Sequence, residues 1–474
     1  MDIDKRVELL QIRDNISSDC RPIDYITYKV AVPEGYGKVG LVFTYTNEHS
    51  EANSNRAVIF VSLHDPNGFR GHRMNPGGRG RVVLELWTSE ADSSPGAFPA
   101  KIVAGTWKIQ LDIRDLEGKP EYELSVYAEA CEEKSEAIES SYPADHVVKA
   151  QASWYKGELH AHSTESDGRY EVARVVEAAI EHGLDFFSLT DHSTCSQWHK
   201  LAKLQNDRIA LIRAMEITSH VGHANLHGMK EWINVYIDQP GWTANDAAKE
   251  LHAQGGLFCV NHAFSGTLSW RVHNLDWSLV DMEEIYHNLE GANNSYQLSL
   301  WDQHLQQGYR IVGVSGTDSH NPFEGLHELG QVVTWVYADE LSEEGVLAGL
   351  RRGQVYISRG PTMRFEARNQ AGSTAGMWES LALDGLVTLH ITAEWSKPLS
   401  LFIMKNGLIQ DVISTVPDDL GHHDVTFIDE KPLENSYYRI ELHDADKREN
   451  YPGIIWRDYS TMRVLSNPIW VTRK

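Results

Sequence analysis

The stretch GELHAHSTESDGRYEVARVVEAAIEHGLDFFSLTDHS, residues 157–193, decides the fold of the central part of this chain. It opens with His160 and His162, which a strand would place on one face because side chains alternate along a strand. Apolar residues then follow helical spacing from Val172 to Ile180, and Gly183 supplies a helix stop. The string DFFSL has the character of a buried strand. The stretch therefore predicts a strand, a helix and a second strand in succession.

The same alternation continues to about residue 360. We expect further strands at 209–218, 223–229, 257–264, 282–288 and 309–320, and helices at 243–256, 294–308 and 341–353. Short apolar strands that alternate with amphipathic helices are typical of a parallel α/β arrangement. Together with the opening stretch, the strands are numerous enough to close a distorted barrel.

The regions on either side carry a different pattern. Short segments rich in β-branched and aromatic residues lie at 24–32, 38–46, 56–64, 81–88, 105–114 and 121–130, and similar segments return at 387–395, 399–407, 422–429, 437–445 and 467–472. Turn residues separate these segments, which indicates antiparallel sandwiches. We therefore predict an N-terminal β-sandwich domain ending in an acidic linker (131–151) over 1–150, an α/β barrel over 151–360, and a C-terminal β-sandwich domain over 361–474.

The bulk composition disfavours several classes of protein. With 43 basic against 67 acidic residues, the net charge of −24 argues against binding to nucleic-acid polymers or anionic membranes. A small anionic substrate stays open, because metal cations can invert the field inside one cleft. The N-terminus lacks a basic and apolar leader, and no apolar run approaches about 18 residues. The four cysteines are scattered, which fits a reducing compartment, so we expect a cytoplasmic protein.

Acidic residues and histidines stand where the central strands end. They come from six separate segments: His160 with His162, Asp191 with His192, Glu216, His223, His262, and Asp318 with His320. In a parallel barrel all carboxyl ends of the strands lie on one rim, which is where active sites are found. Carboxylates and imidazoles packed this closely would repel each other or lack partners. Because both are natural ligands for metal cations, the pattern favours a multi-metal site over unrelated polar residues.

These strings resemble the polymerase and histidinol phosphatase (PHP) superfamily, and within it the CehA/McbA-like metallohydrolases. The resemblance rests on GELHAHSTESDG, SLTDHS, MEIT followed by GHANLHG, VNHAF and VSGTDSH, which occur in this order between about 154 and 360. The flanking regions match no motif, although the ending SNPIWV is similar to the end of many CehA/McbA-like chains. The resemblance implies a distorted (βα)7 barrel that holds two or three divalent metal ions.

The resemblance also implies a set of metal ligands. His160, His162, Glu216 and Asp318 would hold a first metal, Glu216 would bridge to a second metal completed by His223 and His262, and Asp167, His192 and His320 would hold a third. His220 and His227 are alternatives to His223, which the GHxN string favours. Imidazole and carboxylate ligands suit Zn, Mn and Fe alike.

The implied chemistry is hydrolysis. Metals about 3.5–4 Å apart share a hydroxide that attacks phosphorus or a carbonyl carbon, and they neutralise the negative charge that develops. Glu216 would bridge the metals, and Asp318 and Asp191 are candidates for orienting or relaying the proton. Asp191 has a second interpretation, as a hydrogen-bond partner of a metal-bound histidine.

Substrate contacts are predicted at Arg271, His287 and Arg359, with a purely structural role left open for each. Either arginine has the planar donor geometry that clamps a phosphate. The loop 66–81 also gathers Arg70, Arg73, Arg79 and Arg81. We favour a solvated turn there over contact with an anionic substrate or a neighbouring subunit.

Three functions are compatible with the sequence. The leading hypothesis is a metal-dependent phosphoesterase that acts on a small mono- or diester. The alternative is hydrolysis of a carbamate, carboxylic ester or amide by the same centre, since CehA/McbA-like enzymes include aryl-carbamate hydrolases. A non-catalytic carbohydrate- or protein-binding role for the sandwiches is third. The acidic charge disfavours an editing role beside a polymerase, and a homo-oligomer is left open.

Overall fold

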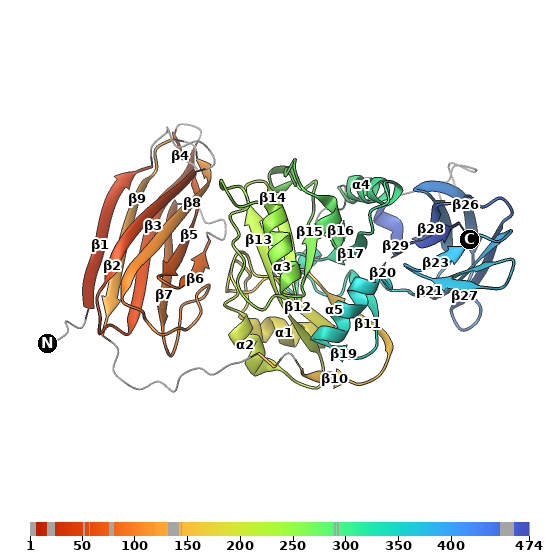
Figure 1. The fold of residues 1–474 in the computed structure, drawn as a ribbon, viewed down its shortest axis with the longest axis horizontal. Helices are drawn as coiled ribbons and strands as arrows, with labels where there is room; N and C mark the ends of the chain where they lie inside the picture. Colours follow the sequence, from red (N-terminus) through yellow and green to blue (C-terminus); the bar gives the residue numbers. More distant parts are fainter. Residues whose placement is uncertain are drawn as a thin grey trace.

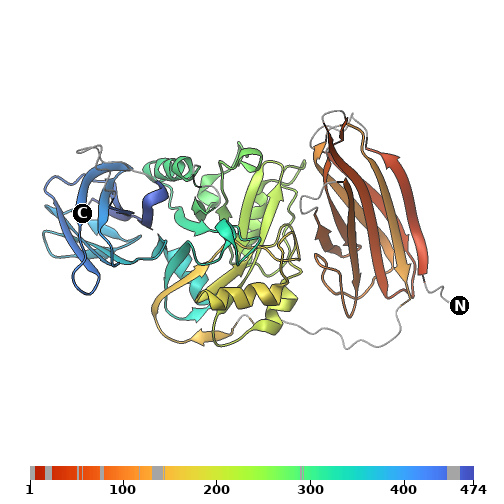
Figure 2. The ribbon, with the colours of Figure 1, turned by 180° about the vertical axis from the view of Figure 1, so that it is seen from behind.

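The computed structural model describes residues 6–16, 24–50, 53–55, 57–74, 80–116, 118–130, 142–143, 145–288, 291, 293–445 and 459–473. Most of the predicted linker, 131–141 and 144, lies outside the described residues. The described chain is a mixed α/β protein in which strands predominate. In both views an N-terminal pair of sheets and a C-terminal group of strands lie at opposite ends of an α/β part (Figure 1, Figure 2).

Residues 6–129 form two antiparallel sheets that pack face to face around one apolar core. One sheet joins β1 (Arg6–Asn15), β9 (Glu121–Glu129), β3 (Lys38–Ser50), β4 (Asn53–Asn55) and β7 (Gly80–Ser89); the other joins β2 (Asp24–Val32), β8 (Gly105–Leu116), β5 (Ala57–Asp65) and β6 (Gly68–Arg73). Side-chain alternation explains the packing. Along β7, Val82, Leu84 and Leu86 face the core, whereas Val83 and Glu85 between them are exposed. Strands β1, β4 and β6 add to those that the sequence predicts.

The central sheet follows chain order. It runs through β11 (Ser153–Glu158), β12 (Phe186–Leu189), β13 (Ala210–Ser219), β14 (Gly222–His227), β15 (Leu257–Val260), β16 (Met282–His287) and β17 (Val312–Gly316). The expectation of an all-parallel arrangement is wrong for β14, which pairs antiparallel with both β13 and β15. Only two residues separate β13 from β14, too few for the crossover that a parallel partner needs.

Helices occupy four of the six connections between these strands, and a fifth helix follows β17 in the described chain. They are α1 (Val172–Glu181), α2 (Trp198–Leu204), α3 (Ala244–Ala253), α4 (Asn294–Gln306) and α5 (Glu343–Arg352), with short 3-10 turns η1 (Gly266–Leu268), η2 (Trp277–Leu279), η3 (Gly325–His327) and η4 (Tyr459–Thr461). Helix α3 begins at Thr243, which forms a capping box with Asp246. Helix α5 ends at Gly353, whose φ of 66° lies in the left-handed region. The sequence pattern does not predict the short helix α2.

The last central strand returns toward the first. Just beyond β17 and β11, Ser319 and Ala161 form a parallel bridge, and the His162 N–H donates to the Ser319 carbonyl at 2.9 Å. β11 pairs with β12 along one edge, and along its opposite edge it pairs antiparallel with β18 (Val333–Ala338). The short pair β10 (Val147–Lys149) and β19 (Leu341–Ser342) lies outside this sheet.

From β18 the same sheet continues into the C-terminal part through β20 (Val355–Ser358), β29 (Met462–Ser466), β28 (Ser436–Asp444), β25 (Leu399–Lys405) and β26 (Leu408–Thr415), with β30 (Ile469–Thr472) and β23 (Ser380–Ala382) alongside. A separate sheet of β22 (Thr374–Gly376), β21 (Thr362–Asn369), β24 (Val387–Glu394) and β27 (His422–Asp429) packs on it. The central and C-terminal parts therefore share hydrogen-bonded strands. No helix among the described residues combines the length and apolar character needed to cross a membrane.

Candidate metal centre

The histidines and carboxylates predicted at the strand ends converge on one region. His160 and His162 follow β11, His192 follows β12, Glu216 lies in β13, His262 follows β15, and Asp318 and His320 follow β17. Five of these seven residues are buried, and Asp318 and His320 are half-buried. Parallel strands that end at the same edge of a sheet explain this convergence.

His223 reaches the same place because β14 runs backwards. In register, His223 pairs with Thr218 near the end of β13, so the beginning of β14 lies at the edge where its neighbours end. His223 Nδ1 lies 3.2 Å from Glu216 Oε1. His227 at the opposite end of β14 instead lies 2.8 Å from the Ser188 hydroxyl. Of the candidate histidines in this segment, His223 is therefore the one that the structure brings to Glu216.

A first group surrounds the gap between Glu216 and Asp318. His160 Nε2 lies 3.3 Å from Glu216 Oε1 and 3.4 Å from Asp318 Oδ1. His162 Nε2 lies 2.8 Å from the same Asp318 oxygen and 3.7 Å from Glu216 Oε2. The group is the one that the resemblance assigns to a first metal.

A second group shares Glu216 with the first. His262 Nε2 lies 3.4 Å from Glu216 Oε1, on which His223 also converges. The Asn261 side chain donates to this oxygen at 2.9 Å and so holds the carboxylate in place. Glu216 therefore lies between two sets of histidines, as a bridging ligand would.

A third group forms around Asp167. His320 Nε2 lies 3.1 Å and His192 Nε2 3.5 Å from Asp167 Oδ1. The His320 Nδ1–H donates to the Asp318 carbonyl at 2.9 Å, which leaves Nε2 free to act as a ligand. The ring of His162 stacks on that of His192 with centroids 4.1 Å apart, so the third group adjoins the first.

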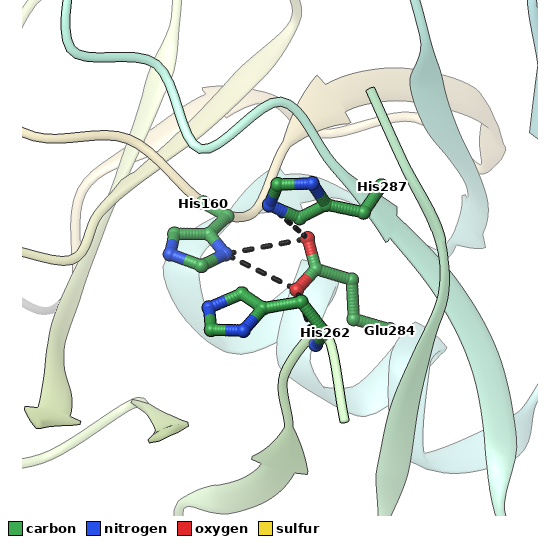
Figure 3. A group of neighbouring side chains, drawn as sticks. All are labelled: His160, His262, Glu284 and His287. Atoms are coloured by element: carbon green, nitrogen blue, oxygen red, sulfur yellow. Dashed lines mark hydrogen bonds and ion pairs between the residues drawn. The ribbon is translucent and has the colours of Figure 1, made fainter. Parts of the chain in front are cut away.

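Glu284, which the sequence reasoning missed, supports the cluster from β16 (Figure 3). Both of its oxygens face His160 Nδ1, at 3.3 and 3.2 Å, on the side of the ring away from Glu216. The His262 N–H also donates to Glu284 at 3.3 Å. A carboxylate behind a ligating histidine sets its tautomer and orientation. The signal was present: two adjacent glutamates in a strand buried on both faces put one of them toward the rim.

The donor atoms fit divalent cations. His160, His262, Glu284 and His287 offer ligand atoms within 4.8 Å of one another; so do His162, Asp167, His192 and His320, the trio His160, His162 and Glu216, and the trio His192, Glu216 and His223. Several of these buried atoms, among them His160 Nε2, Glu216 Oε2 and His223 Nδ1, have no hydrogen-bond partner with suitable geometry among the described residues. Buried polar atoms rarely lack partners in proteins, and a cation would provide them.

The carboxylates and imidazoles of this cluster shift each other's pKa. Burial alone would raise the pKa of Glu216, but the facing His192, His160 and His223 hold that pKa well below its ordinary range. Burial, together with His192 and His320, lowers the pKa of His162 to about 3. The facing carboxylates raise the pKa of His160, His192, His262 and His320, whereas His162 and His223 have lowered pKa values. A metal ion would displace the protons of the first four imidazoles and take over the pairing with the carboxylates.

Two of the predicted ligands have unusual backbone conformations. His262 has a φ of 24° and Asp318 a φ of 51°, and Ser193, which follows His192, has a φ of 58°. A residue other than glycine adopts such a φ angle at a cost of about 1–3 kcal/mol, and residues with this strain cluster at functional sites. The surrounding structure thus holds these two residues where the cluster needs them.

The remaining predicted site residues lie in different surroundings. Asp191 accepts hydrogen bonds from the backbone and hydroxyl groups of Ser163 and Ser166, at 2.7–3.2 Å, and so organises the turn before Asp167. His287 is buried beside Asp318, with Nε2 3.5 Å from Oδ2. The Arg271 guanidinium donates to the His220 carbonyl.

Arg359 donates to the carbonyl groups of Ser460 and Met462 at 3.1 and 3.5 Å, in the C-terminal part of the chain. In the loop 66–81, Arg70 pairs with Asp65 at 2.5 Å, Arg81 is exposed, and Arg79 lies outside the described residues. Arg73 is the exception to a solvated turn, because its Nη1 donates to the carbonyl groups of Thr164 and Ser166.

Arg169 is a second residue that the sequence reasoning missed. Its N–H donates to the His320 carbonyl at 2.9 Å, and it stands two residues beyond Asp167. The side chain is exposed, and its guanidinium has no hydrogen-bond or ion-pair partner among the described residues. Its position directly after the SDG string was the signal available in the sequence.

No family model matches the chain. A segment of 50 residues is 38% identical to the DNA polymerase/3'-5' exonuclease PolX of Bacillus subtilis (strain 168), and the match covers 10% of this chain and only 9% of that protein. Among solved structures, a two-domain protein containing a predicted PHP-like metal-dependent phosphoesterase from Bacteroides vulgatus ATCC 8482 shares 18% identity. It has a TM-score of 0.40 and covers 62% of this chain and 91% of its own.

The chain resembles the PHP superfamily. A PHP-like protein is thus among the matches, as the motifs lead one to expect, whereas the narrower CehA/McbA-like assignment stays a prediction. A further solved structure, PsfC from Pseudomonas syringae PB-5123, shares 14% identity, with a TM-score of 0.32 and coverage of 39% of this chain and 82% of that one.

Proposed function

We propose that the chain is a metal-dependent hydrolase of the PHP type, most closely related to the CehA/McbA-like group, and that it cleaves small phosphate esters. The observation that carries the proposal is the position of Glu216, whose buried carboxylate is contacted by histidines from four separate segments. The central strands β11–β17 would form the distorted barrel of that family, with the domain limits near residues 150 and 360.

Two or three divalent ions would be held by the three groups described above. When bound, such ions lower the pKa of a coordinated water and neutralise charge that develops on the substrate. Glu216 and Asp318 supply the anionic charge that retains the cations. His287 is buried, its Nε2 lies 3.5 Å from Asp318 Oδ2, and neither ring nitrogen has a hydrogen-bond partner in the described part of the chain, so it would be placed to hold a substrate oxygen or pass it a proton.

Arg169 is the residue that favours an anionic substrate. The backbone N–H of Arg169 is bonded to the His320 carbonyl, beside the group around Asp167, and its guanidinium is exposed. Arginine binds phosphate through paired donors, and a side chain without an ion-pair partner is available for this role. Arg271 and Arg359, the clamps expected from the sequence, instead bond to backbone carbonyl groups.

A substrate panel tests the proposal. Metal-loaded protein is assayed with p-nitrophenyl phosphate, bis-p-nitrophenyl phosphate and 1-naphthyl methylcarbamate. Turnover of either phosphate supports the proposal, provided that His160→Ala abolishes it. Arg169→Ala should raise the KM for a phosphate ester about 10- to 100-fold and Arg169→Lys less. Absence of any phosphate turnover with Zn, Mn or Fe would contradict the phosphoesterase assignment.

One observation favours the alternative, cleavage of an aryl carbamate or carboxylic ester. Phe264, two residues beyond His262, and Tyr296 are both exposed, and their ring centroids lie 5.8 Å apart. The Ala263 N–H donates to the Gln297 side chain, which fixes the loop after β15 beside the first turn of helix α4. Such a pair suits an aromatic leaving group. If the carbamate alone is hydrolysed, and Phe264→Ala raises its KM, the alternative is correct.

A further inference from the structure

The N-terminal pair of sheets reaches the loop that carries Asp167. Arg73, the last residue of β6, donates from Nη1 to the Thr164 carbonyl at 2.8 Å and to the Ser166 carbonyl at 3.1 Å. Asp167 follows directly. The loop belongs to the central part of the chain, whereas Arg73 lies some 90 positions earlier in sequence. A guanidinium from one part of the protein thus holds two backbone groups next to a predicted metal ligand in another.

The opposite side of this loop is held by Asp191. Its Oδ1 accepts from the Ser163 N–H at 2.8 Å and from the Ser166 N–H at 3.2 Å, and its carboxylate also accepts from both serine hydroxyls. The N–H groups of the turn therefore face the Asp191 carboxylate, and the carbonyl groups of the turn face the Arg73 guanidinium. Hydrogen bonds to charged partners are stronger than neutral ones, so both ends of the turn are fixed.

A second contact joins the two loops that carry ligands of the third group. The Gly96 N–H donates to the buried Glu165 side chain at 3.0 Å, and the Gly96 carbonyl accepts from the Thr194 hydroxyl at 2.8 Å. Gly96 has a φ of 86°, and a Cβ there would lie 2.1 Å from the His72 carbonyl oxygen, so glycine is required. Thr194 lies two residues beyond His192. The N-terminal sheets thus connect the loops of Asp167 and His192.

We propose that Arg73 is a positioning residue for the group of Asp167, His192 and His320, and that the N-terminal sheets are therefore part of the metal centre. This inference rests on the proposed metal centre. Asp167 depends on its loop more than the ligands of the other two groups do. The ligands around Glu216 lie in or next to paired strands, whereas Asp167 lies in a loop without strand pairing. Loss of Arg73 leaves two carbonyl groups without this partner and lets the loop move, which displaces Asp167 before the other ligands.

Metal binding in the full-length protein tests the inference. Asp167→Asn first identifies which bound equivalent belongs to this group, by equilibrium dialysis against buffered Mn²⁺ or Zn²⁺ and elemental analysis. Arg73→Ala should weaken that same equivalent about 10- to 100-fold, as loss of residues that orient ligands commonly does. Arg73→Lys, which keeps the charge and one donor direction, should restore part of the affinity.

Arg70→Ala is the matched control, because Arg70 lies in the same hairpin but pairs with Asp65 within it. Unchanged metal binding in Arg73→Ala overturns the inference, and so does an equal loss in Arg70→Ala and Arg73→Ala. If Arg73→Ala does not fold, Arg73→Lys decides: wild-type affinity for the Asp167 equivalent then contradicts the inference. Failure of the proposed metal centre gives a different result, since the wild-type protein then binds no metal at this cluster, and failure of the phosphoesterase assignment alone leaves these metal measurements unchanged.

Discussion

Replacement of Glu284 by glutamine should weaken metal binding without unfolding the protein. Glu284 places both carboxylate oxygens 3.2–3.3 Å from His160 Nδ1, so the ring donates to a charged acceptor and turns Nε2 toward Glu216 and Asp318. A glutamine has nearly the same shape and keeps one carbonyl acceptor, but it removes the charge. The expected effect is therefore on the strength of the hydrogen bond and not on packing.

The magnitude follows from the two kinds of hydrogen bond. A bond to a charged group contributes about 1.5–3 kcal/mol and a neutral one about 0.5–1.5 kcal/mol, so the change costs about 1–1.5 kcal/mol. With about 1.4 kcal/mol for each factor of ten, metal affinity should fall about tenfold. Glu284→Ala should cost more, about 100-fold, because the ring then has no acceptor at this position.

Glu283→Gln is a close control for this experiment. Glu283 is the preceding residue of β16, equally buried, and lies 3.0 Å from His304 Nδ1 on the other face of the strand. It also accepts from Gln297 at 3.3 Å, outside the metal groups. Competition titrations with a fluorescent chelator, run beside thermal melts, measure affinity and stability separately. Equal losses of affinity in Glu283→Gln and Glu284→Gln, or no loss in Glu284→Gln, would refute the reasoning.

Three further predictions follow from the same structure. Removal of metal with a chelator should abolish activity and lower the melting temperature, and return of Zn, Mn or Fe should restore both, since a ligand at 1,000 times its Kd stabilises by about 4 kcal/mol; a melt that is insensitive to both steps would argue against a metal centre. Asp318→Asn should lower kcat by at least about 100-fold while circular dichroism stays unchanged, because this carboxylate faces His160, His162 and His287; wild-type kcat would remove Asp318 from the mechanism. Burial and Lys108 lower the pKa of His64 to about 3, so the unfolded state takes up a proton below about pH 6.5 that the folded state does not, and this contribution to stability is lost as the pH falls toward 3. His64→Gln should therefore make the free energy of unfolding fall less steeply between pH 6.5 and 5, by about 1 kcal/mol per pH unit, which melts at each pH measure; an unchanged slope would contradict the shift.

Much of the architecture was predictable because local patterns carry it. The helix at α1 was expected from apolar spacing, and the structure buries Val172, Val175 and Val176 on one face. The helix at α3 was expected from Thr243 at its N-cap, and the structure forms that cap. The reversal of β14 was not expected, because hydrophobic alternation looks the same in parallel and antiparallel strands. The connection between β13 and β14 could have indicated it, since it is too short for a crossover.

The roles of arginines were the least predictable part of the site. The sequence suggested Arg271 and Arg359 as phosphate clamps, yet both donate to carbonyl groups of distant segments. It suggested a solvated turn around Arg73, whose two acceptors lie about 90 positions away in the chain. A long flexible side chain has no local pattern that shows its partner, because that partner is chosen by packing between parts of the protein.

The sequence by itself determined which residue types could bind metals and where along the chain they occur. The i, i+2 histidines at 160 and 162 and the polar ends of apolar strands indicate candidate ligands, because side-chain alternation along a strand and the shared edge of a sheet can be inferred from the sequence. Only the tertiary structure decided which carboxylates face which imidazoles. It placed Glu216 between histidines of several strands, Glu284 behind His160, and Arg73 against the loop of Asp167. These contacts join residues far apart in sequence, and their distances depend on how the sheets close and pack.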